Sequence, residues 1–266
     1  MTSTDIITLH VQLACVWEAC VEKAGNVTRS RDFADTTLLD FLASAAAAAP
    51  ALALAGDVGV GAAVLEAVRR TRLVCRANTN LGIALLLAPL CAARSRPLAE
   101  VLAALTVADS RAVGAAIRLC SPGGLGSVES HDAADEPTLP LGEWMALAAH
   151  RDRVALQYVT CFAGVAEAAD DVAAGLGDGL AAAITRAQLL QLARHGDSLI
   201  ERKRGEGREA ARRAGEVLAG RMTWADLDAW LRAEGNGRNP GTTADVIAAA
   251  LFVLLGDGRL TPAARW

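Results

Sequence analysis

The chain has 266 residues, a formal net charge of −4 and an apolar content of 53%, whereas aromatic residues make up only 4%. A chain of this length can bury one large core, so we predict a single domain over residues 1–266. The acidic balance argues against nucleic acid as a partner, because nucleic-acid binding selects for a basic face, and it favours small-molecule substrates. An interior built from Ala, Leu and Val favours helices packed on helices, since Ala has the best helix propensity and is depleted in strands.

The apolar spacing predicts helices along the whole chain. Apolar residues recur every three or four positions over residues 6–20, which predicts an amphipathic helix that stops near Gly25. Thr37, with Asp40 three residues later, resembles a capping box, and a second helix should run from there towards residues 50–56. Further helices are expected at about 59–76, 80–94, 97–119, 141–149, 152–168, 176–195, 205–219, 223–234 and 243–255. No alternating strand pattern appears, so we predict an all-α fold, a multi-helix bundle.

Two segments rich in glycine need separate interpretation. SPGGLGSVESHDAADEPTLP, residues 121–140, has no apolar period, and it is either a solvated linker or a lid. GDVGVG, residues 56–61, follows no strand and lacks the Lys-Ser/Thr of a P-loop, so we interpret it as a connection between helices.

Cysteine usage and apolar runs bear on the cellular location. The cysteines form no CxxC pair and lie in apolar helical patterns, which predicts small core residues in a reducing compartment. No secretory signal is visible in MTSTDIITLH, and the apolar stretches at 41–56 and 81–93 are too interrupted or too short to span a bilayer. We therefore expect no membrane partner and a cytoplasmic location. The six cysteines are Cys15, Cys20, Cys75, Cys91, Cys120 and Cys161.

Polar residues gather at four predicted helix ends. The first cluster mixes cations able to hold phosphate with carboxylates able to hold a metal ion, although alone it is also compatible with an ordinary loop. It consists of Lys23, Gly25, Asn26, Thr28, Arg29, Arg31, Asp32 and Asp35. The second is Asn78-Thr79-Asn80, which exceeds what a single helix N-cap requires.

The third and fourth clusters lie in the second half of the chain. GDSLIERKRGEG, residues 196–207, places Asp197 before a turn and cations after it; such a run is either a solvated face or a polyphosphate clamp. GNGRNPGTTADVIAAALFVLL, residues 235–255, opens a Gly/Asn/Pro loop directly into an apolar helix, whose N-terminus would attract anions. The four histidines show no ligand spacing, and no HExxH or GxSxG motif is present, so zinc hydrolysis and serine catalysis have no support.

These clusters, in this order, resemble the family of triphosphoribosyl-dephospho-CoA synthases. The family's Glu, Pro-Lys-Pro-Gly and Val-x-Arg segment is similar to Glu18 with residues 22–29, and its Asn-Thr-His-Lys-Gly motif is similar to residues 78–82. Its Asp-Thr-Asn segment is similar to residues 197–199, and its Pro-Gly-Gly-x-Ala-Asp motif to residues 240–245. This chain departs from the pattern at two places, where Glu22 and Ala24 replace the prolines and Asn80-Leu81 replaces His-Lys.

The resemblance implies an all-helical transferase that uses ATP as a (triphospho)ribosyl donor. In the family reaction a ribose hydroxyl of dephospho-CoA attacks C1′ of the ATP ribose, adenine leaves, and the triphosphate stays on the transferred sugar. Such a site needs cations and Mg²⁺ to hold the triphosphate. It also needs carboxylates to stabilise an oxocarbenium-like centre and to take a proton.

The resemblance also implies roles for particular residues. For the phosphates we expect Lys23, Arg29, Arg202, Lys203 and the backbone near Gly241. For the ribose and base we expect Asn78, Thr79 and Asn80, and further nucleotide contacts from Asn26, Thr242 and Thr243. The candidate general bases are Asp35, Asp197 and Asp245, and the candidate Mg²⁺ ligands are Asp32, Asp35, Asp197 and Asp245. Asp152 and Gln157 are additional candidates.

The replaced His-Lys leaves the acceptor open, and three alternatives follow. Ribosyl or phosphoribosyl transfer could go to another cofactor precursor, as in tetrahydromethanopterin-type one-carbon pathways. A non-catalytic nucleotide-binding protein is a second alternative, and a purely structural bundle, which would leave the four polar helix ends unexplained, is a third. An alanine-rich helical surface can also pair with a second copy, so a homodimer is expected as an option.

Overall fold

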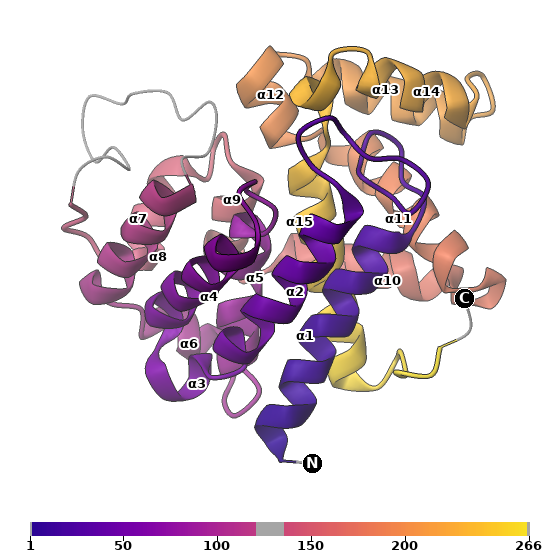
Figure 1. Ribbon diagram of the computed structural model, residues 1–266. Coiled ribbons are helices and arrows are strands. Elements are labelled where there is room, and N and C mark those ends of the chain that lie inside the picture. The colour runs from indigo at the N-terminus through magenta and orange to yellow at the C-terminus, as the bar shows by residue number, and fades with distance from the viewer. Residues whose placement is uncertain (1, 121–135, 265–266) are drawn as a thin grey trace.

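The computed structural model describes residues 2–120 and 136–264, in which the regular elements are all helices and no β-strand is present (Figure 1). The prediction of an all-α fold is therefore confirmed. The first eight helices are α1 (Ser3–Cys20), α2 (Leu38–Leu52), α3 (Ala55–Val58), α4 (Val60–Val74), α5 (Leu81–Ala92), α6 (Leu98–Ala103), α7 (Val107–Cys120) and α8 (Leu141–Ala148). The others are α9 (Arg153–Val159), α10 (Ala163–Gly175), η1 (Leu176–Asp178), α11 (Leu180–His195), α12 (Ser198–Arg204), α13 (Gly207–Leu218), α14 (Trp224–Arg232), η2 (Gly235–Arg238) and α15 (Gly241–Asp257).

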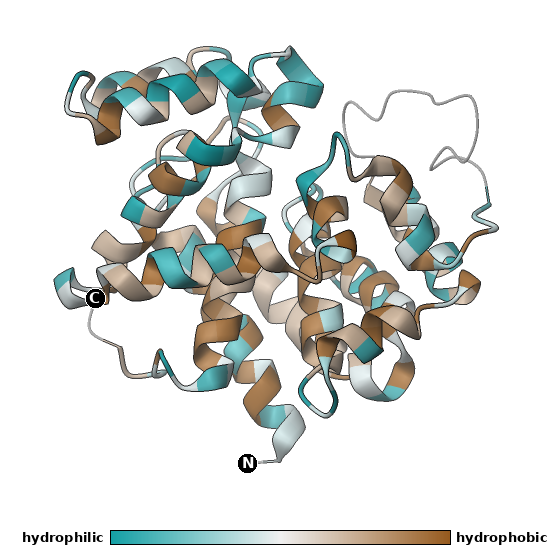
Figure 2. Cartoon of the chain, turned by 180° about the vertical axis from the view of Figure 1, so that it is seen from behind, coloured by the Kyte–Doolittle hydropathy of each residue, from teal (hydrophilic) through white to brown (hydrophobic). Residues whose placement is uncertain are grey.

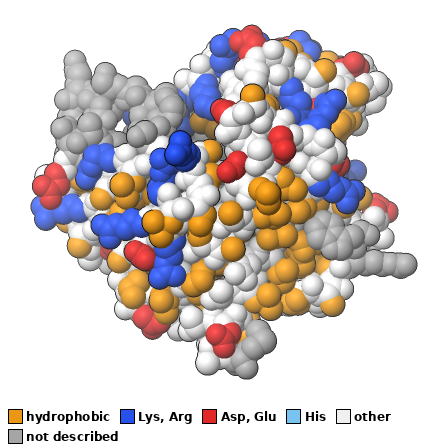
Figure 3. Space-filling view, viewed as in Figure 1, with side chains coloured by type: hydrophobic (Ala, Val, Ile, Leu, Met, Phe, Trp, Pro, Cys, Tyr) orange, Lys and Arg blue, Asp and Glu red, His pale blue; other side chains and the backbone are white. Residues whose placement is uncertain are grey.

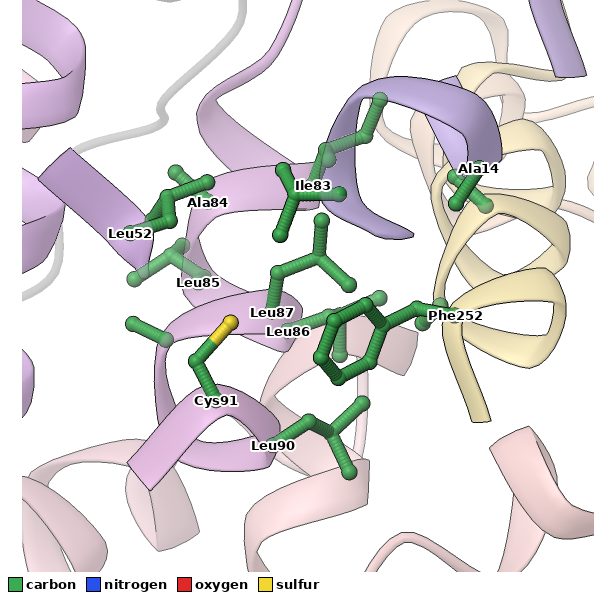
Figure 4. Close-up of a cluster of buried hydrophobic side chains, with 14 of the residues drawn as sticks. Ala14, Leu52, Ile83, Ala84, Leu85, Leu86, Leu87, Leu90, Cys91 and Phe252 are labelled. Atoms are coloured by element: carbon green, nitrogen blue, oxygen red, sulfur yellow. The ribbon is translucent and has the colours of Figure 1, made fainter. Parts of the chain in front are cut away.

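Helices α5 and α15 form the centre of the bundle. Both are apolar around their circumference, which is the pattern of a helix enclosed by others. Every residue of α5 except Gly82 is buried. Phe252 of α15 packs against Leu86, Leu87 and Leu90 of α5, and the apolar colouring concentrates in these inner helices (Figures 2 and 4). Helices α1 and α10 pack on α15, and α4 packs on α5, so the core is built from Ala, Leu and Val as the composition suggested.

A smaller apolar cluster joins α11 to α13 and α14. It contains Leu192 of α11, Ala210 and Ala214 of α13, and Leu227 and Leu231 of α14. The outer surface of α13 and α14 is hydrophilic, and these helices lie at the top of the molecule (Figures 1 and 2). This unit carries α12 and the loop before α15, both of which contribute to the pocket described below.

The connection between α1 and α2 is fastened to α14 through one buried carboxylate. Asp228 accepts hydrogen bonds from the Gly25 N–H at 2.8 Å and from Arg232 Nε at 2.9 Å, and it pairs with Arg31. Gly25 has φ +75°, and a Cβ there would lie 2.7 Å from Leu231 Cβ. The glycine therefore permits close packing of the α1–α2 loop on α14.

Several predicted helix boundaries hold, but two long helices were predicted wrongly. Asp40 accepts hydrogen bonds from the backbone N–H and the hydroxyl of Thr37, so the predicted start of α2 is confirmed. The helix expected at 97–119 is broken before Thr106, whose own capping pair with Asp109 starts α7. The helix expected at 152–168 is broken by the positive φ angles of residues 161–162.

Other expectations concern single elements or residue types. Helix α1 stops at Cys20 rather than near Gly25, and α12 was not predicted at all. Four cysteines are buried as predicted, but Cys20 is half-buried and Cys161 is exposed. No described helix is long and apolar enough to cross a membrane. The lid or linker at 121–140 and His131 fall largely or wholly outside the described residues.

Candidate active site

A pocket of about 850 Å³ lies where helix ends from distant parts of the chain meet. Its walls come from the N-terminal parts of α2, α5, α9 and α15, from α12, and from the C-terminal ends of α1, α4, α7 and α8. The N-termini of α5, α9 and α15 carry partial positive charge, so the part of the pocket beside them favours a negatively charged ligand. The pocket combines carboxylates, amides, cations and an apolar wall.

Asp245, near the start of α15, is a partly buried carboxyl at the pocket. It lines the pocket and lies so close to the start of α5 that a Cβ on Gly82 would be 2.0 Å from its Oδ2. Burial raises the pKa of Asp245 well above its ordinary value, and the negative charges of Glu18, Asp197 and Asp152 add to the shift. A pocket carboxyl whose pKa is raised by burial and by neighbouring negative charge has the properties of a general base or acid.

Glu18 of α1 lines the same pocket and is held by a buried lysine. Lys23 Nζ lies 3.1 Å from Glu18 Oε1, and the two side chains are 0% and 4% exposed. The ammonium also donates hydrogen bonds to the backbone carbonyls of Glu18 and Val21. Burial raises the pKa of Glu18, whereas the Lys23 charge acts in the opposite direction. Lys23 thus fixes Glu18 from behind and does not itself face the pocket.

A chain of amide side chains forms the polar wall. Asn26 Nδ2 donates to Asn239 Oδ1 at 2.7 Å, and Asn239 Nδ2 donates to Asn236 Oδ1 at 2.8 Å. Gln188 Nε2 donates to Asn26 Oδ1 at 3.3 Å and to the Ala24 carbonyl at 2.7 Å. The chain connects the α1–α2 loop to the loop before α15 and fixes the orientation of each amide facing the pocket.

Two cations of α12 stand beside this amide wall. Lys203 Nζ donates to the Asn236 carbonyl at 3.1 Å, and Arg202 NH1 lies 3.2 Å from Asp152 Oδ2. Burial, with the nearby Arg202 charge, lowers the pKa of Lys203. Both side chains line the pocket and retain donors for a phosphate group, because neither is saturated by its recorded partner.

The segment Asn78-Thr79-Asn80 lines the pocket and is also tied into the scaffold. Asn78 Oδ1 accepts the Leu81 N–H at 3.3 Å, which is a capping contact. The Thr79 hydroxyl lies 2.6 Å from that of Ser44, and Asn80 Nδ2 donates to Thr71 Oγ1 at 2.8 Å. These contacts orient the segment, and they account for one hydrogen-bonding position of each side chain.

Asp197 is held by hydrogen bonds from two helices, α12 and α15. Its Oδ1 caps α12 by accepting the N–H groups of Leu199 at 2.9 Å and Ile200 at 3.1 Å. Its Oδ2 accepts the Thr243 N–H at 2.7 Å and the Thr243 hydroxyl at 2.8 Å. Four donors occupy this buried carboxylate, so it ties the start of α12 to the start of α15 and has little capacity left for a ligand.

The contact between Asp197 and Thr243 also occupies a backbone donor at the N-terminus of α15. The N–H of Gly241 donates to the Asn239 carbonyl at 2.8 Å, that of Thr243 donates to Asp197, and that of Ala244 donates to the Pro240 carbonyl at 3.1 Å. Since most of the first-turn donors are used internally, the α15 N-terminus would act on an anion mainly through its dipole.

The pocket brings together most, though not all, of the residues that the sequence indicated. Those that line it are Asn26, Asp35, Asn78, Thr79, Asn80, Asp152, Arg202, Lys203, Gly241, Thr242 and Asp245. Those that do not line it are Lys23, Arg29, Asp32, Gln157, Asp197 and Thr243. Arg29 is 70% exposed and lies 3.9 Å from Glu22, whereas Asp32 accepts the Leu38 N–H at 2.7 Å at the start of α2. Gln157 is buried, where it bonds the Arg153 carbonyl and the Val165 N–H.

Sequence reasoning missed some lining residues. Asn236 and Asn239 belong to the loop that the fourth cluster already marked, so the composition of that loop carried a signal. Glu18 was indicated only by the family resemblance, because it lies within the predicted helix at residues 6–20 and outside the four polar clusters. The cations at the ends of α4 and α8 gave no signal, because an arginine at a helix C-terminus is common. The missed cations are Arg72, Arg76 and Arg151.

The described residues contain no group of three or more His, Cys, Asp or Glu side chains that could hold a metal ion. Mg²⁺ commonly uses one or two carboxylates together with substrate phosphates and waters. Asp35, which lines the pocket on the side of the α1–α2 loop, is an oxygen donor of that kind.

Comparison with known proteins shows similarity to one enzyme class. The model of the family described as ATP:dephospho-CoA triphosphoribosyl transferase matches residues 5–261. A crystal structure from Archaeoglobus fulgidus, of a protein described as a triphosphoribosyl-dephospho-CoA synthase, is similar with 27% sequence identity and a TM-score of 0.66. The similarity covers 82% of this chain and 100% of that one. No curated protein matches the sequence.

Proposed function

Because the chain belongs to the ATP:dephospho-CoA triphosphoribosyl transferase family, we propose that its pocket holds ATP as the donor and that Asp245 takes the proton from the attacking hydroxyl. The chain is thus a transferase, of the class used to build a prosthetic group. The observation that carries the proposal is the meeting, in one pocket, of the Asp245 carboxyl with the cations of α12.

The triphosphate lies, in this proposal, against α12 and the amide wall. Arg202 and Lys203 supply positive charge, and Asn236 and Asn239 supply oriented amide groups. The N-terminus of α15 adds its dipole, which favours anions. Lys23, Arg29 and Thr243 are not proposed as phosphate contacts, because none of them lines the pocket.

The transfer itself is a displacement at C1′ of the ATP ribose. The acceptor hydroxyl oxygen forms the new bond to C1′, the bond from C1′ to the adenine nitrogen breaks, and adenine leaves with that electron pair. The hydroxyl proton passes to the Asp245 carboxylate. Glu18, held by Lys23, contributes negative charge beside the oxocarbenium-like carbon, where it is stabilising in a desolvated site.

Mg²⁺ fits the proposed site through Asp35. A carboxylate oxygen at the rim and the triphosphate oxygens form the kind of donor set that this ion prefers. When bound, the ion would neutralise part of the triphosphate charge. Asp32 and Asp197 are not proposed as ligands, because their carboxylates cap helices.

The remaining expectations stay proposals. The family match over residues 5–261 supports a single domain. A cytoplasmic location, the absence of nucleic acid and membrane as partners, and a homodimer rest on the sequence reasoning alone. The acceptor is proposed to be dephospho-CoA or a close relative, since this is the acceptor that the family description names.

Mass spectrometry of a single reaction tests the proposal. The protein is incubated with ATP, Mg²⁺ and dephospho-CoA, and the products are searched for free adenine and a triphosphoribosyl adduct. The wild-type protein should form both in equal amounts. Asp245→Asn should bind ATP but lose about 10²- to 10⁴-fold in rate, the usual contribution of general base catalysis.

The outcomes separate the alternatives. ATP binding without release of adenine in the presence of any acceptor would favour a non-catalytic nucleotide-binding protein. Adenine release only with another cofactor precursor would retain the donor site and change the acceptor. If ATP neither binds nor loses adenine, the proposed site is wrong.

A further inference from the structure

The pocket carries a second group of cations, separate from those of α12. Arg72 lies at the C-terminal end of α4, Arg76 follows it, and Arg151 follows α8. Within residues 2–120 and 136–264, none of the three has a carboxylate partner, whereas Arg202 pairs with Asp152. Lys and Arg side chains gather on the α4 and α7 side of the molecule (Figure 3). Cations without carboxylate partners at a pocket are available to a negatively charged ligand.

The wall beside these cations is apolar. Ile117 of α7 and Trp144, Met145 and Leu147 of α8 line it, together with Leu85 of α5. Trp144 and Met145 are 8% and 7% exposed, so most of their surface is already packed and only a face remains for a ligand. Near α12 the lining side chains are mainly polar, with Arg202, Lys203, Asn236 and Asn239 beside Leu199. The two ends of the pocket therefore differ in chemistry.

Arg76 is held in a defined place. The Arg72 guanidinium donates a hydrogen bond to the Arg76 carbonyl, and the Cys75 N–H donates to the Thr71 carbonyl at 2.9 Å. Asn80 Nδ2 donates to the Thr71 hydroxyl at 2.8 Å. These contacts fix both ends of the connection from α4 to α5, so the Arg76 side chain starts from an ordered backbone beside the Asn78–Asn80 segment.

The size and charge of the ligands argue for two anionic subsites. A volume of about 850 Å³ lies in the upper part of the range for small-molecule pockets. A donor triphosphate and a second phosphorylated substrate in the same cavity would repel each other strongly at low dielectric unless each had its own cations. The α12 pair, with its amide wall, suits the more highly charged triphosphate, which leaves Arg76 for the second substrate.

We propose that Arg76, supported by Arg72, is a specificity-determining residue that binds the phosphate groups of the acceptor, while the α7–α8 wall holds an uncharged arm or ring of the same molecule. The acceptor class is then an organic phosphate or diphosphate with an extended apolar or aromatic part. This inference rests on the proposed transferase function of the pocket.

The test compares acceptors with and without phosphate. Binding of dephospho-CoA, of adenosine and of ATP is measured by calorimetry for wild type, Arg76→Gln and Arg70→Gln, and adenine release is measured with each acceptor. Arg70 is the matched control, because it lies on α4, six residues before Arg76, pairs with Glu66 at 2.8 Å and does not line the pocket. Arg76→Gln should weaken dephospho-CoA binding by about 10- to 100-fold, the size of a lost charge-assisted hydrogen bond. Adenosine and ATP binding should be unchanged, and Arg70→Gln should behave as wild type.

Several results would overturn the inference. Arg76→Gln could weaken ATP instead, which would assign Arg76 to the donor. Arg76→Gln could leave dephospho-CoA binding unchanged, which would mean that Arg76 does not bind the acceptor phosphates. The wild-type protein could also bind dephospho-CoA no better than adenosine, which would mean that no subsite binds these phosphates. Failure of the proposed function looks different, since the wild-type protein would then neither bind ATP nor release adenine.

Discussion

Replacement of Lys23 by Met tests whether the buried ion pair with Glu18 is a structural requirement. Met has nearly the length and volume of Lys, so the change removes the charge and leaves little cavity. Glu18 would remain buried without its cation, 3.1 Å from the position that the ammonium held. Removing one partner of a buried pair typically costs about 3–5 kcal/mol, because the other charge is left uncompensated.

The expected loss of unfolding free energy in Lys23→Met corresponds to a lower melting temperature. At about 2–4 °C per kcal/mol for chains of this size, a loss of 3–5 kcal/mol lowers Tm by about 6–20 °C. Urea unfolding followed by circular dichroism gives the free energy, and a thermal scan gives Tm. The exposed cation Arg29 provides the control, because Arg29→Gln removes only a 70% exposed charge 3.9 Å from Glu22. That control should stay within about 0.5 kcal/mol of wild type.

The pH dependence of the variant provides an independent check. Burial already raises the pKa of Glu18, and loss of Lys23 removes the opposing effect, so the folded pKa should rise further. A carboxyl whose folded pKa exceeds its unfolded value binds more protons in the native state, so its penalty grows as pH rises. Lys23→Met should therefore be least destabilised in mild acid and most at neutral to alkaline pH. The double variant Glu18→Gln with Lys23→Met should lose this pH dependence. A single-variant loss below about 1 kcal/mol, constant with pH, would refute the reasoning about an uncompensated buried charge.

Three shorter predictions concern the glycines and the catalytic carboxyl. Gly82→Ala would place a Cβ 2.0 Å from Asp245 Oδ2 and displace the carboxyl. In steady-state kinetics kcat should therefore fall about 10²-fold, with little change in the ATP Kd. A wild-type kcat would contradict the close approach of Gly82 to Asp245. The acidic limb of the kcat–pH profile should lie above the ordinary carboxyl range, because burial raises the pKa of Asp245 and the base must be deprotonated; the limb should disappear in the residual activity of Asp245→Asn, and an unshifted limb would exclude Asp245 as the base. Gly25→Ala, at φ +75° and against Leu231, should lower unfolding free energy by about 1–3 kcal/mol in urea titrations, and an unchanged midpoint would show that the loop can move away.

The helices could be predicted well where the apolar period and the caps agree. Thr37 and Asp40 marked the start of α2 because the capping signal is local. Thr106 and Asp109 carry the same signal, yet the apolar period runs past them, and following that period joined α6 to α7 wrongly. Helix α12 was missed because its basic residues suggested a ligand clamp, although Asp197 is an N-cap residue type.

The site could be predicted only in part, because sequence reveals polar residues but not their remaining hydrogen-bonding capacity. Asn26 and Asn239, 213 positions apart, meet through an amide hydrogen bond that no local pattern indicates. The arginines at the ends of α4 and α8 also join the pocket only through the packing of α4, α7 and α8. Helix N-termini were easier to anticipate, since a Gly/Asn/Pro loop before an apolar helix is a local signal.

Asp197 and Asp245 have different surroundings, and this difference indicates which carboxylate is the better candidate for the general base. Both belong to motifs of the family resemblance, and the sequence assigns them the same set of roles. Asp197 accepts four hydrogen bonds from Leu199, Ile200 and Thr243, so its lone pairs are occupied and its removal would chiefly loosen α12 from α15. Asp245 faces the pocket and is surrounded by burial and like charge, which destabilise its ionised form and increase its affinity for a proton. Because a base must gain a proton during the reaction, we propose Asp245 as the base, whereas Asp197, with its four hydrogen bonds, is proposed to hold the start of α15 in place.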